Sequence, residues 1–276
     1  AEASSEPRKQ EPTTPLAGVF EPGSGGGGRL RTDLSRRVRA DADIPRGEVR
    51  RWSLKRGDLI EAQVRRSRRG RTDFVVGGID SVNGQGLDAR KQPAPPFEDR
   101  DAVPVAGNYA KRLFKHAPVG DGSRVVVTGP TRAAASEMLK KLAGEVASAG
   151  VVTTLVIVSA RPEQDETVSD VEVILGDATK GPDGVLGALE LALERDKRLA
   201  ESGRKTALLV DGLDLFSGEH PGEIFGAARN LASGGSLTIV ASAGAGSALE
   251  SQASAIGVVA GGRKLKLDKK ASWSAK

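Results

Sequence analysis

The fold is decided by the stretch Val125-Val126-Val127-Thr128-Gly129-Pro130-Thr131-Arg132-Ala133-Ala134-Ala135-Ser136, a β-branched apolar run that Gly-Pro interrupts before a helix-forming segment. A strand, a turn and a helix in this order are typical of a phosphate loop, whose pattern G-x-x-x-x-G-K-[ST] needs a second glycine and a lysine. Gly129 and Ser136 fit its two ends, but Ala134 and Ala135 stand at the Gly and Lys positions. The residues alone leave three alternatives open: a working nucleotide site, a disabled one, or a chance strand-turn-helix.

The residues around this stretch alternate between buried-strand and helix patterns. Helices are predicted at 133–148, 184–200 and 224–231, and strands at 124–128, 151–159, 207–210 and 236–241. Continuous Val/Leu/Ile strands separated by helices indicate a parallel sheet covered on both faces. Ligands bind at the carboxyl ends of such strands, which is where Gly129 and Asp211 are predicted to lie.

The preceding part of the chain has a different pattern. Short apolar runs from Val49 onward are joined by polar turns at 55–58 and 83–84, which predicts a small all-β barrel or sheet. Three prolines between Gln92 and Pro96 favour an extended connector. We therefore expect a disordered tail over 1–15, an all-β domain over 16–90, a Pro-rich linker over 91–104 and an α/β domain over 105–276.

Composition limits the chemistry. The 276 residues are 38% apolar and 28% charged, without cysteine and with two histidines, His116 and His220; this excludes disulfides and thiolate metal sites, and we expect no structural metal. No apolar run is long enough to span a membrane, so we expect a cytoplasmic protein without a membrane partner.

Between Arg29 and Arg71 the chain carries 15 Lys+Arg against 6 Asp+Glu, a local net charge of +9 within a total of +5. This asymmetry suggests that one segment binds a polyanion, with a solvated basic face as the alternative.

Four motifs carry a resemblance to a known family. They are Val49 to Asp58, Asp80-Ser81-Val82-Asn83-Gly84, Gly226-Ala227-Ala228-Arg229-Asn230 and Gly234-Gly235-Ser236-Leu237-Thr238-Ile239. These motifs, which occur in the family's order, resemble those of bacterial transcription termination factor Rho. The resemblance covers the chain from about Gly18 to its C-terminus. The resemblance implies a cold-shock-like (OB) RNA-binding domain followed by a RecA-like ATPase domain. In the family these assemble into a hexameric RNA translocase, of which this chain resembles a C-terminally shortened, degenerate member.

The resemblance also implies which residues face the nucleotide. ATP with Mg²⁺ is the implied cofactor, with Ser136 and Asp211 as the Mg²⁺ ligands. The family's lysine, catalytic glutamate, arginine finger and adenine-stacking phenylalanine are replaced by Ala135, Ala160, Lys269 and Gly257. These losses predict weakened nucleotide binding and no hydrolysis, so no catalytic residue is assigned. The implied cofactor-binding residues are Gly129, Pro130, Thr131, Arg132, Ala133, Ala134, Ala135, Ser136 and Asp211.

The implied RNA positions have changed in the same way. Gly27, Arg29, Asp43 and Asp73 stand where the family has base-contacting aromatic residues, and losing base stacking removes sequence preference. Arg31 and Asp41 match the family's base-contacting arginine and aspartate, with a role as structural partners only as the alternative. Trp52 is predicted to be a core residue. We expect residual binding of single-stranded RNA to be weak, directed at phosphates and sequence-tolerant, through Arg50, Arg51, Arg65, Arg66, Arg68, Arg69 and Arg71.

Three hypotheses of function follow. The leading one is a Rho-like protein associated with termination that binds RNA but does not hydrolyse ATP. The alternatives are an active ATP-dependent RNA helicase that terminates transcription, and a non-enzymatic interaction module or inactive partner of Rho rings. A homo-oligomer and a mixed ring with Rho subunits are both consistent with the family.

Overall fold

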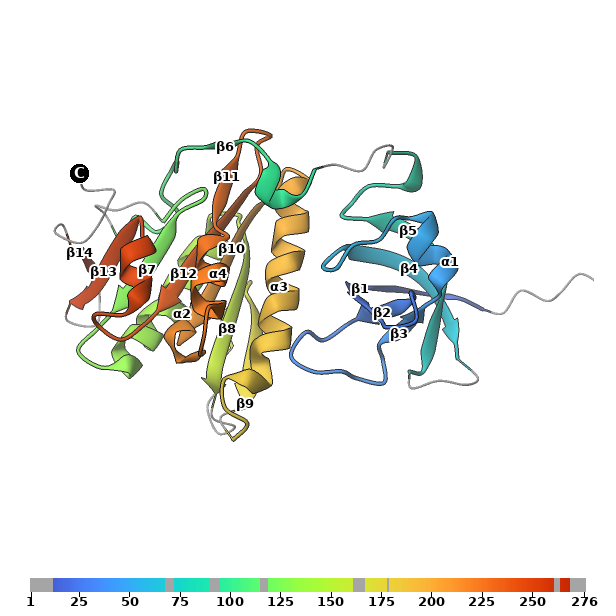
Figure 1. Cartoon of the computed structure of the whole chain (residues 1–276), viewed down its shortest axis with the longest axis horizontal. Helices are drawn as coiled ribbons and strands as arrows, with labels where there is room; N and C mark the ends of the chain where they lie inside the picture. Colours follow the sequence, from blue (N-terminus) through green and yellow to red (C-terminus); the bar gives the residue numbers. More distant parts are fainter. Residues whose placement is uncertain are drawn as a thin grey trace, which may run out of the picture. The chain divides into compact units, whose positions relative to one another are not determined.

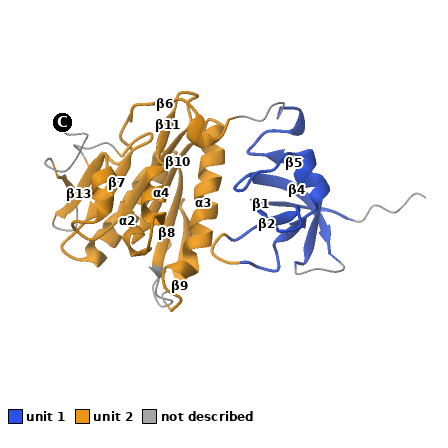
Figure 2. Cartoon of the chain, in the orientation of Figure 1, with its two compact units in different colours: residues 1–33, 37–92 blue, residues 34–36, 93–276 orange. Residues whose placement is uncertain are grey.

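The computed structural model describes residues 12–67, 72–89, 95–114, 119–160, 167–177, 179–260 and 264–268. The chain divides into two compact units (Figures 1 and 2), Ala1–Asp33 with Arg37–Gln92 and Leu34–Arg36 with Pro93–Lys276. Each unit has its own sheet and its own hydrophobic core.

The first unit is a closed barrel whose strands, among the described residues, follow the order β1-β2-β3-β5-β4. Its elements are β1 (Thr14–Pro22), β2 (Gly28–Arg31), β3 (Ala42–Ile44), α1 (Arg46–Arg51), β4 (Leu59–Arg66), β5 (Phe74–Val82) and the 3₁₀ turn η1 (Leu87–Ala89). Alternate residues of β4, namely Ile60, Ala62 and Val64, are buried because successive side chains of a strand point to opposite faces. Trp52 is buried in the same core. The predicted small all-β domain and the core position of Trp52 are therefore confirmed.

The second unit is an α/β domain built on one sheet. Among the described residues its main path runs β14-β13-β7-β12-β10-β8-β9, and β11 and β6 extend it beside β12. Its strands are β6 (Ala102–Val103), β7 (Arg124–Thr128), β8 (Val152–Ala160), β9 (Glu172–Asp177), β10 (Lys205–Asp211), β11 (Arg229–Leu231), β12 (Ser236–Ser242), β13 (Ala255–Ala260) and β14 (Lys264–Leu267). Its helices and turns are η2 (Phe97–Asp99), α2 (Arg132–Ser148), α3 (Asp183–Glu201), η3 (Leu213–Leu215), α4 (His220–Gly226) and η4 (Ala248–Gln252).

The two long helices cover opposite faces of this sheet. Leu155 and Leu209 share a core with the buried side of α2. Thr154, the neighbour of Leu155, instead accepts a hydrogen bond from Arg195 of α3. The path from β13 to β9 is parallel throughout, so the predicted parallel sheet with both faces covered is confirmed. The carboxyl ends of β7, β10 and β12 consequently lie along one edge.

One predicted element is wrong in part. The segment 224–231 was expected to be helical, but α4 ends at Gly226 and Arg229–Leu231 forms β11, which pairs with β12 and β6. Sequence periodicity could not reveal this because the strand has only three residues and its partners are distant in the chain. Within the part of the chain that the structure describes, no helix is long and apolar enough to cross a membrane.

Candidate nucleotide site and candidate nucleic-acid interface

The phosphate-loop residues lie at the carboxyl end of β7, as predicted. Gly129 and Pro130 leave the strand, and Thr131 is the N-cap of α2, which begins at Arg132. The Thr131 Oγ1 atom accepts a hydrogen bond from the Ala134 N–H at 3.1 Å, and the Ala135 N–H bonds to the Thr131 carbonyl at 3.2 Å. Helix N-termini bind anions through such N–H groups. Here these two amides are engaged by the loop itself.

The positions of the missing glycine and lysine carry no polar side chain. Ala135 is 1% exposed and belongs to the core shared by α2 and the sheet. Arg132 is the only Lys or Arg between Gly129 and Ser136. Its Nη1 and Nη2 atoms bind the two carboxylate oxygens of Asp214 at 2.8 and 3.1 Å. The one cation of the loop is therefore paired within the protein.

The electrostatics of this pair favour its charged form. Burial favours the neutral form of Asp214, but hydrogen bonds from Arg132 and from the Gly244 N–H outweigh it and lower the pKa of Asp214. The hydrogen bonds with Asp214 raise the pKa of Arg132. Both groups are thus ionised at neutral pH.

The predicted metal ligands are brought together. Asp211 ends β10, and the Ser136 and Ser242 hydroxyls each donate to one of its carboxylate oxygens. The Ser242 Oγ atom in turn accepts the Gly212 N–H at 2.9 Å. Hydroxyl and carboxylate oxygens are ligands that Mg²⁺ prefers, so Ser136 and Asp211 fit the metal. In the loop beside them the one cation, Arg132, is paired with Asp214.

The remaining nucleotide positions are described only in part. Ala160 is the last residue of β8, and Lys269 lies outside the described residues. Gly257 lies on β13, where an added Cβ would come within 3.2–3.3 Å of Leu265 and Phe114. The space beside Gly257 is therefore filled by these two side chains, and it offers no room for an aromatic replacement.

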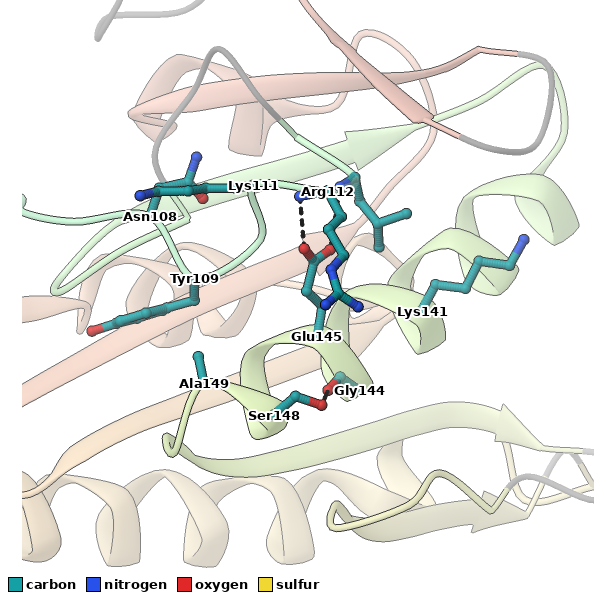
Figure 3. A pocket seen from close by; sticks show the side chains of 10 residues that line it. Asn108, Tyr109, Lys111, Arg112, Lys141, Gly144, Glu145, Ser148 and Ala149 are labelled. Atoms are coloured by element: carbon teal, nitrogen blue, oxygen red, sulfur yellow. Dashed lines mark hydrogen bonds between the residues drawn. The ribbon is translucent and has the colours of Figure 1, made fainter.

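A cavity of about 600 Å³ lies away from these residues, between the C-terminal half of α2 and the segment before β7. Its lining includes Tyr109, Lys111, Arg112 and Lys141 (Figure 3). The Glu145 carboxylate accepts the backbone N–H groups of Arg112 and Leu113 at 2.7 and 3.2 Å, which fastens the segment to α2. No local sequence pattern indicated this cavity, because residues about 30 positions apart build it.

On the barrel, the predicted base-contacting pair is internal. Arg31 is 6% exposed; it donates to Glu21 at 2.9 Å and to the Asp33 carbonyl at 3.0 Å, and its guanidinium lies 3.4 Å from Asp41. Asp41 is fully buried and accepts the Thr32 N–H at 2.9 Å and the Val38 N–H at 3.2 Å. Both residues therefore hold loops of the barrel together.

Ion pairs occupy the positions at which the resemblance places aromatic residues. Arg29 and Asp43 are cross-strand partners, 3.9 Å apart, and Arg39 pairs with Asp73 at 3.2 Å. At Gly27 an added Cβ would lie 2.7 Å from the Ile44 carbonyl oxygen. No side chain fits there without moving the backbone, so a stacking ring could not be restored at Gly27 by substitution alone.

Glu21 joins two arginines and was not predicted from the sequence. It accepts hydrogen bonds from Arg31 and, at 3.0 Å, from Arg37. Burial favours neutral Glu21, but these hydrogen bonds prevail and lower its pKa. Glu21 and Arg37 are 16 residues apart, and no local pattern links them. The only sequence feature that could have indicated this role is that Glu21 is the single acidic residue of β1.

The arginines predicted to contact phosphate are exposed where the structure describes them. Arg50 and Arg51 lie on α1, and Arg65 and Arg66 end β4. Arg68, Arg69 and Arg71 lie outside the described residues. The exposed cations are consistent with phosphate contacts, which need no pocket.

Asp41→Ala is expected to lower the free energy of unfolding of the barrel by about 2–3 kcal/mol, because the Thr32 and Val38 N–H groups lose their acceptor and the buried Arg31 guanidinium loses a carboxylate neighbour. Asp43→Ala, on the neighbouring and partly exposed pair with Arg29, is the matched control and should cost less than about 0.5 kcal/mol. Urea unfolding followed by the fluorescence of buried Trp52 measures both. A loss of RNA affinity in Asp41→Ala with unchanged stability would show that Asp41 contacts bases instead.

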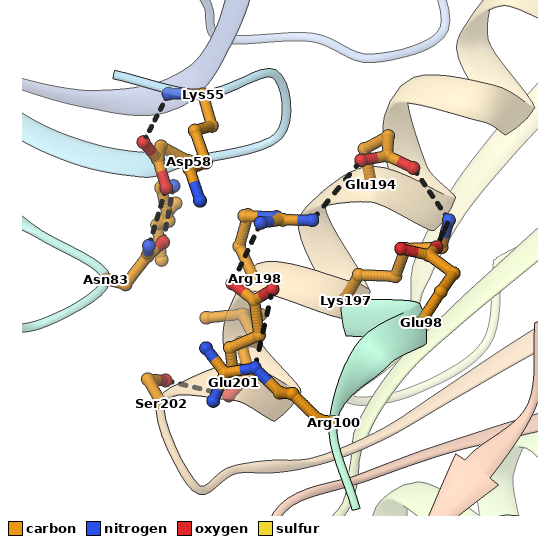
Figure 4. A network of polar contacts seen from close by, with 12 residues as sticks. Lys55, Asp58, Asn83, Glu98, Arg100, Glu194, Lys197, Arg198, Glu201 and Ser202 are labelled. Atoms are coloured by element: carbon orange, nitrogen blue, oxygen red, sulfur yellow. Dashed lines mark hydrogen bonds and ion pairs between the residues drawn. The ribbon is translucent and has the colours of Figure 1, made fainter. Parts of the chain in front are cut away.

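Two of the motifs that carry the resemblance meet in a structural clamp. The Asp58 carboxylate accepts the Lys55 N–H at 2.8 Å and the Asn83 amide at 2.7 Å, while the Asn83 Oδ1 atom accepts the Leu59 N–H at 2.9 Å (Figure 4). Asn83 and Gly84 both have positive φ, 54° and 77°, as a tight hairpin turn requires. These motif residues therefore build the barrel.

Comparison with known proteins agrees with this architecture. The family described as "Rho termination factor, RNA-binding domain" matches residues 16–88. Transcription termination factor Rho of Streptomyces coelicolor is 30% identical over 82% of this chain and 62% of that protein; Rho of Bacillus subtilis is 29% identical over 74% and 56%. Rho of Pseudomonas aeruginosa is 27% identical over 82% and 64%. The chain thus spans between half and two thirds of the length of these relatives.

Among solved structures, the ATP synthase subunit NeqB of Nanoarcheaum equitans aligns with 62% of this chain and 56% of its own at a TM-score of 0.45 and 14% identity. The fold assignment depends instead on the strand order and on the sequence relatives. A barrel that matches the Rho RNA-binding domain precedes a parallel α/β sheet, and relatives named Rho align across both units. Residues 16–88 thus belong to the family of Rho RNA-binding domains, and the chain as a whole is similar to transcription termination factor Rho.

Proposed function

We propose that this protein binds RNA through phosphate contacts, acts in association with transcription termination, and does not turn over ATP. One observation carries the proposal: the loop at Gly129–Ser136 has no lysine, and its single cation, Arg132, is neutralised by Asp214. The RNA component rests on the barrel's family match and on its exposed arginines.

The absence of a free cation from this loop matters most for catalysis. Phosphoryl transfer depends on positioned positive charge that stabilises the transferring group. Ser136 and Asp211 would hold a Mg²⁺ ion, which would supply part of this charge. Ala135 contributes nothing toward the phosphates, and Arg132 is committed to Asp214. Hydrolysis therefore lacks the protein's share of charge stabilisation.

A coupled ATPase assay with pyrimidine-rich single-stranded RNA tests this part. We expect the unaltered protein and Asp211→Asn to give the same background rate, because neither supports turnover. RNA-stimulated turnover that Asp211→Asn abolishes would refute the proposal and support the active helicase hypothesis.

RNA binding should be strongly salt-dependent. Each phosphate contact to single strands contributes about −0.7 to the slope of log affinity against log salt. Arg50→Ala with Arg51→Ala should therefore make the slope less steep by about 1.4, equally for pyrimidine-rich and purine-rich RNA. Fluorescence anisotropy of labelled oligonucleotides at several salt concentrations measures this.

The matched control removes two exposed cations from the second unit, Lys111→Ala with Arg112→Ala. We expect this pair to leave the slope unchanged. No binding at low salt by the unaltered protein would support the interaction-module hypothesis and remove the RNA component of the proposal.

The proposal extends to assembly, either with further copies of this chain or with Rho subunits. Light scattering after size-exclusion chromatography, with and without an authentic Rho, tests it directly. A monomer in both mixtures would contradict ring assembly.

A further inference from the structure

The ion pair between Arg132 and Asp214 joins three segments at the carboxyl edge of the sheet. Arg132 is the first residue of α2, and Asp214 lies in η3, just after β10. Gly212, with φ of 86°, connects β10 to η3. The Gly244 N–H, which follows β12, donates to the Asp214 Oδ2 atom at 2.9 Å. Asp214 is thus held from one side by backbone and from the other by Arg132.

The Arg132 guanidinium uses both terminal nitrogens on Asp214, which is the geometry in which arginine binds carboxylates and phosphates alike. A phosphate that binds through this same edge of the guanidinium must therefore compete with Asp214 for the two N–H donors. The side chain of Arg132 is 45% exposed, so an anion in solution can reach it. The low pKa of Asp214 keeps this competitor ionised at neutral pH.

We propose that Asp214 is an inhibitory counterion of the phosphate loop. It binds both terminal nitrogens of the Arg132 guanidinium, and removing the charge of Asp214 turns the loop into a binding site for a polyphosphate anion. This inference rests on the proposed function, since it gives a reason for the weakened nucleotide binding that is expected of the loop. The Thr131 side chain, which takes the Ala134 N–H, adds a second internal contact that an anion must displace.

Isothermal titration calorimetry with inorganic tripolyphosphate tests the inference on the full chain. Asp214→Asn retains an oxygen for the Gly244 N–H but loses the charge, and it should bind tripolyphosphate about tenfold more tightly than the unaltered protein. Adding Arg132→Gln to this variant should cancel the gain. In the otherwise unaltered protein Arg132→Gln should change affinity less than about twofold, because the guanidinium is already occupied.

Glu137→Gln is the matched charge control. Glu137 lies on the same helix, 64% exposed, and pairs locally with Lys140 at 3.2 Å. Its loss removes the same charge without freeing Arg132, so affinity should stay near that of the unaltered protein. Equal gains in Glu137→Gln and Asp214→Asn, or a gain that survives Arg132→Gln, would overturn the inference.

If Asp214→Asn folds poorly, the variant Arg132→Gln alone still tests the inference. A large loss of tripolyphosphate affinity in Arg132→Gln alone would show that Asp214 does not occlude the guanidinium. ATP turnover by the unaltered protein would contradict the proposed function. Equal tripolyphosphate affinities of the unaltered protein and a folded Asp214→Asn would contradict the inhibitory role alone.

Discussion

Gly235→Ala is expected to lower the free energy of unfolding of the second unit by about 3 kcal/mol or more. A Cβ at Gly235 would lie 1.9 Å from the Ala200 carbonyl oxygen and 2.8 Å from its carbon. These are backbone atoms at the end of α3. They cannot swing aside, because the Gly203 N–H bonds to the Ala200 carbonyl at 3.0 Å and the Ser236 N–H to the Arg204 carbonyl at 3.1 Å.

The control is Gly187→Ala in α3, the helix whose end Gly235 approaches. An added Cβ there meets nothing within 4 Å, so the variant should be more stable by up to about 1 kcal/mol, the difference in helix propensity. Thermal unfolding followed by circular dichroism compares the two. Similar melting temperatures for Gly235→Ala and the unaltered protein would mean that the junction of α3 and β12 is looser than the contacts indicate.

This glycine also shows why the fold was predictable. Gly235, Asn83 and Asp58 belong to motifs that carry the family resemblance, and each has a structural role. Gly235 permits a close backbone approach, Asn83 forms a hairpin turn, and Asp58 clamps two turns together. Such roles can be recognised in the sequence, since only a few residue types can fill them. The parallel sheet was equally readable, because its strands are continuous apolar runs.

For the candidate sites, the sequence predicted where residues lie but not which partners they contact. The sequence placed Ser136 near Asp211 correctly, but it could not reveal that both oxygens of Asp211 receive serine hydroxyls, since Ser242 lies 31 residues away. Nor could it pair Arg132 with Asp214 across 82 residues. Arg31 and Asp41 were identified as a base-contacting pair or structural partners, and only burial distinguishes these roles. Contacts between distant segments decide each of these cases, and local patterns carry no information about them.

A second cluster, on α3, leads to the other large expected effect. Asp196 is fully buried beside Arg195, whose Nε atom lies 3.2 Å from Asp196 Oδ1, while Asp196 Oδ2 has no hydrogen-bond partner among the described residues. Arg195 also donates to Glu172 and Thr154, so its charge is shared among several acceptors. Burial raises the pKa of Asp196 to about 7, although Arg195 acts in the opposite direction.

The sign of the pH dependence follows from this raised pKa. In the unfolded chain Asp196 ionises near pH 4, whereas in the folded protein it keeps its proton to about pH 7. Between these values the folded state binds more protons than the unfolded state, so stability falls as pH rises. The contribution of Asp196 to the free energy of unfolding is complete below about pH 4 and lost above about pH 7. A pKa shift of about 3 units corresponds to about 4 kcal/mol at most.

Asp196→Asn isolates this effect because asparagine does not titrate. The difference in unfolding free energy between Asp196→Asn and the unaltered protein should grow in favour of the variant by about 2–4 kcal/mol from about pH 4.5 to about pH 8. Urea unfolding at several pH values measures it, and the other titrating groups cancel in the difference. Asp43→Asn, on the partly exposed pair of the barrel, should give a difference that stays nearly constant. A constant difference for Asp196→Asn as well would mean that Arg195 keeps Asp196 ionised in the folded protein, since its attraction would then outweigh the cost of burial.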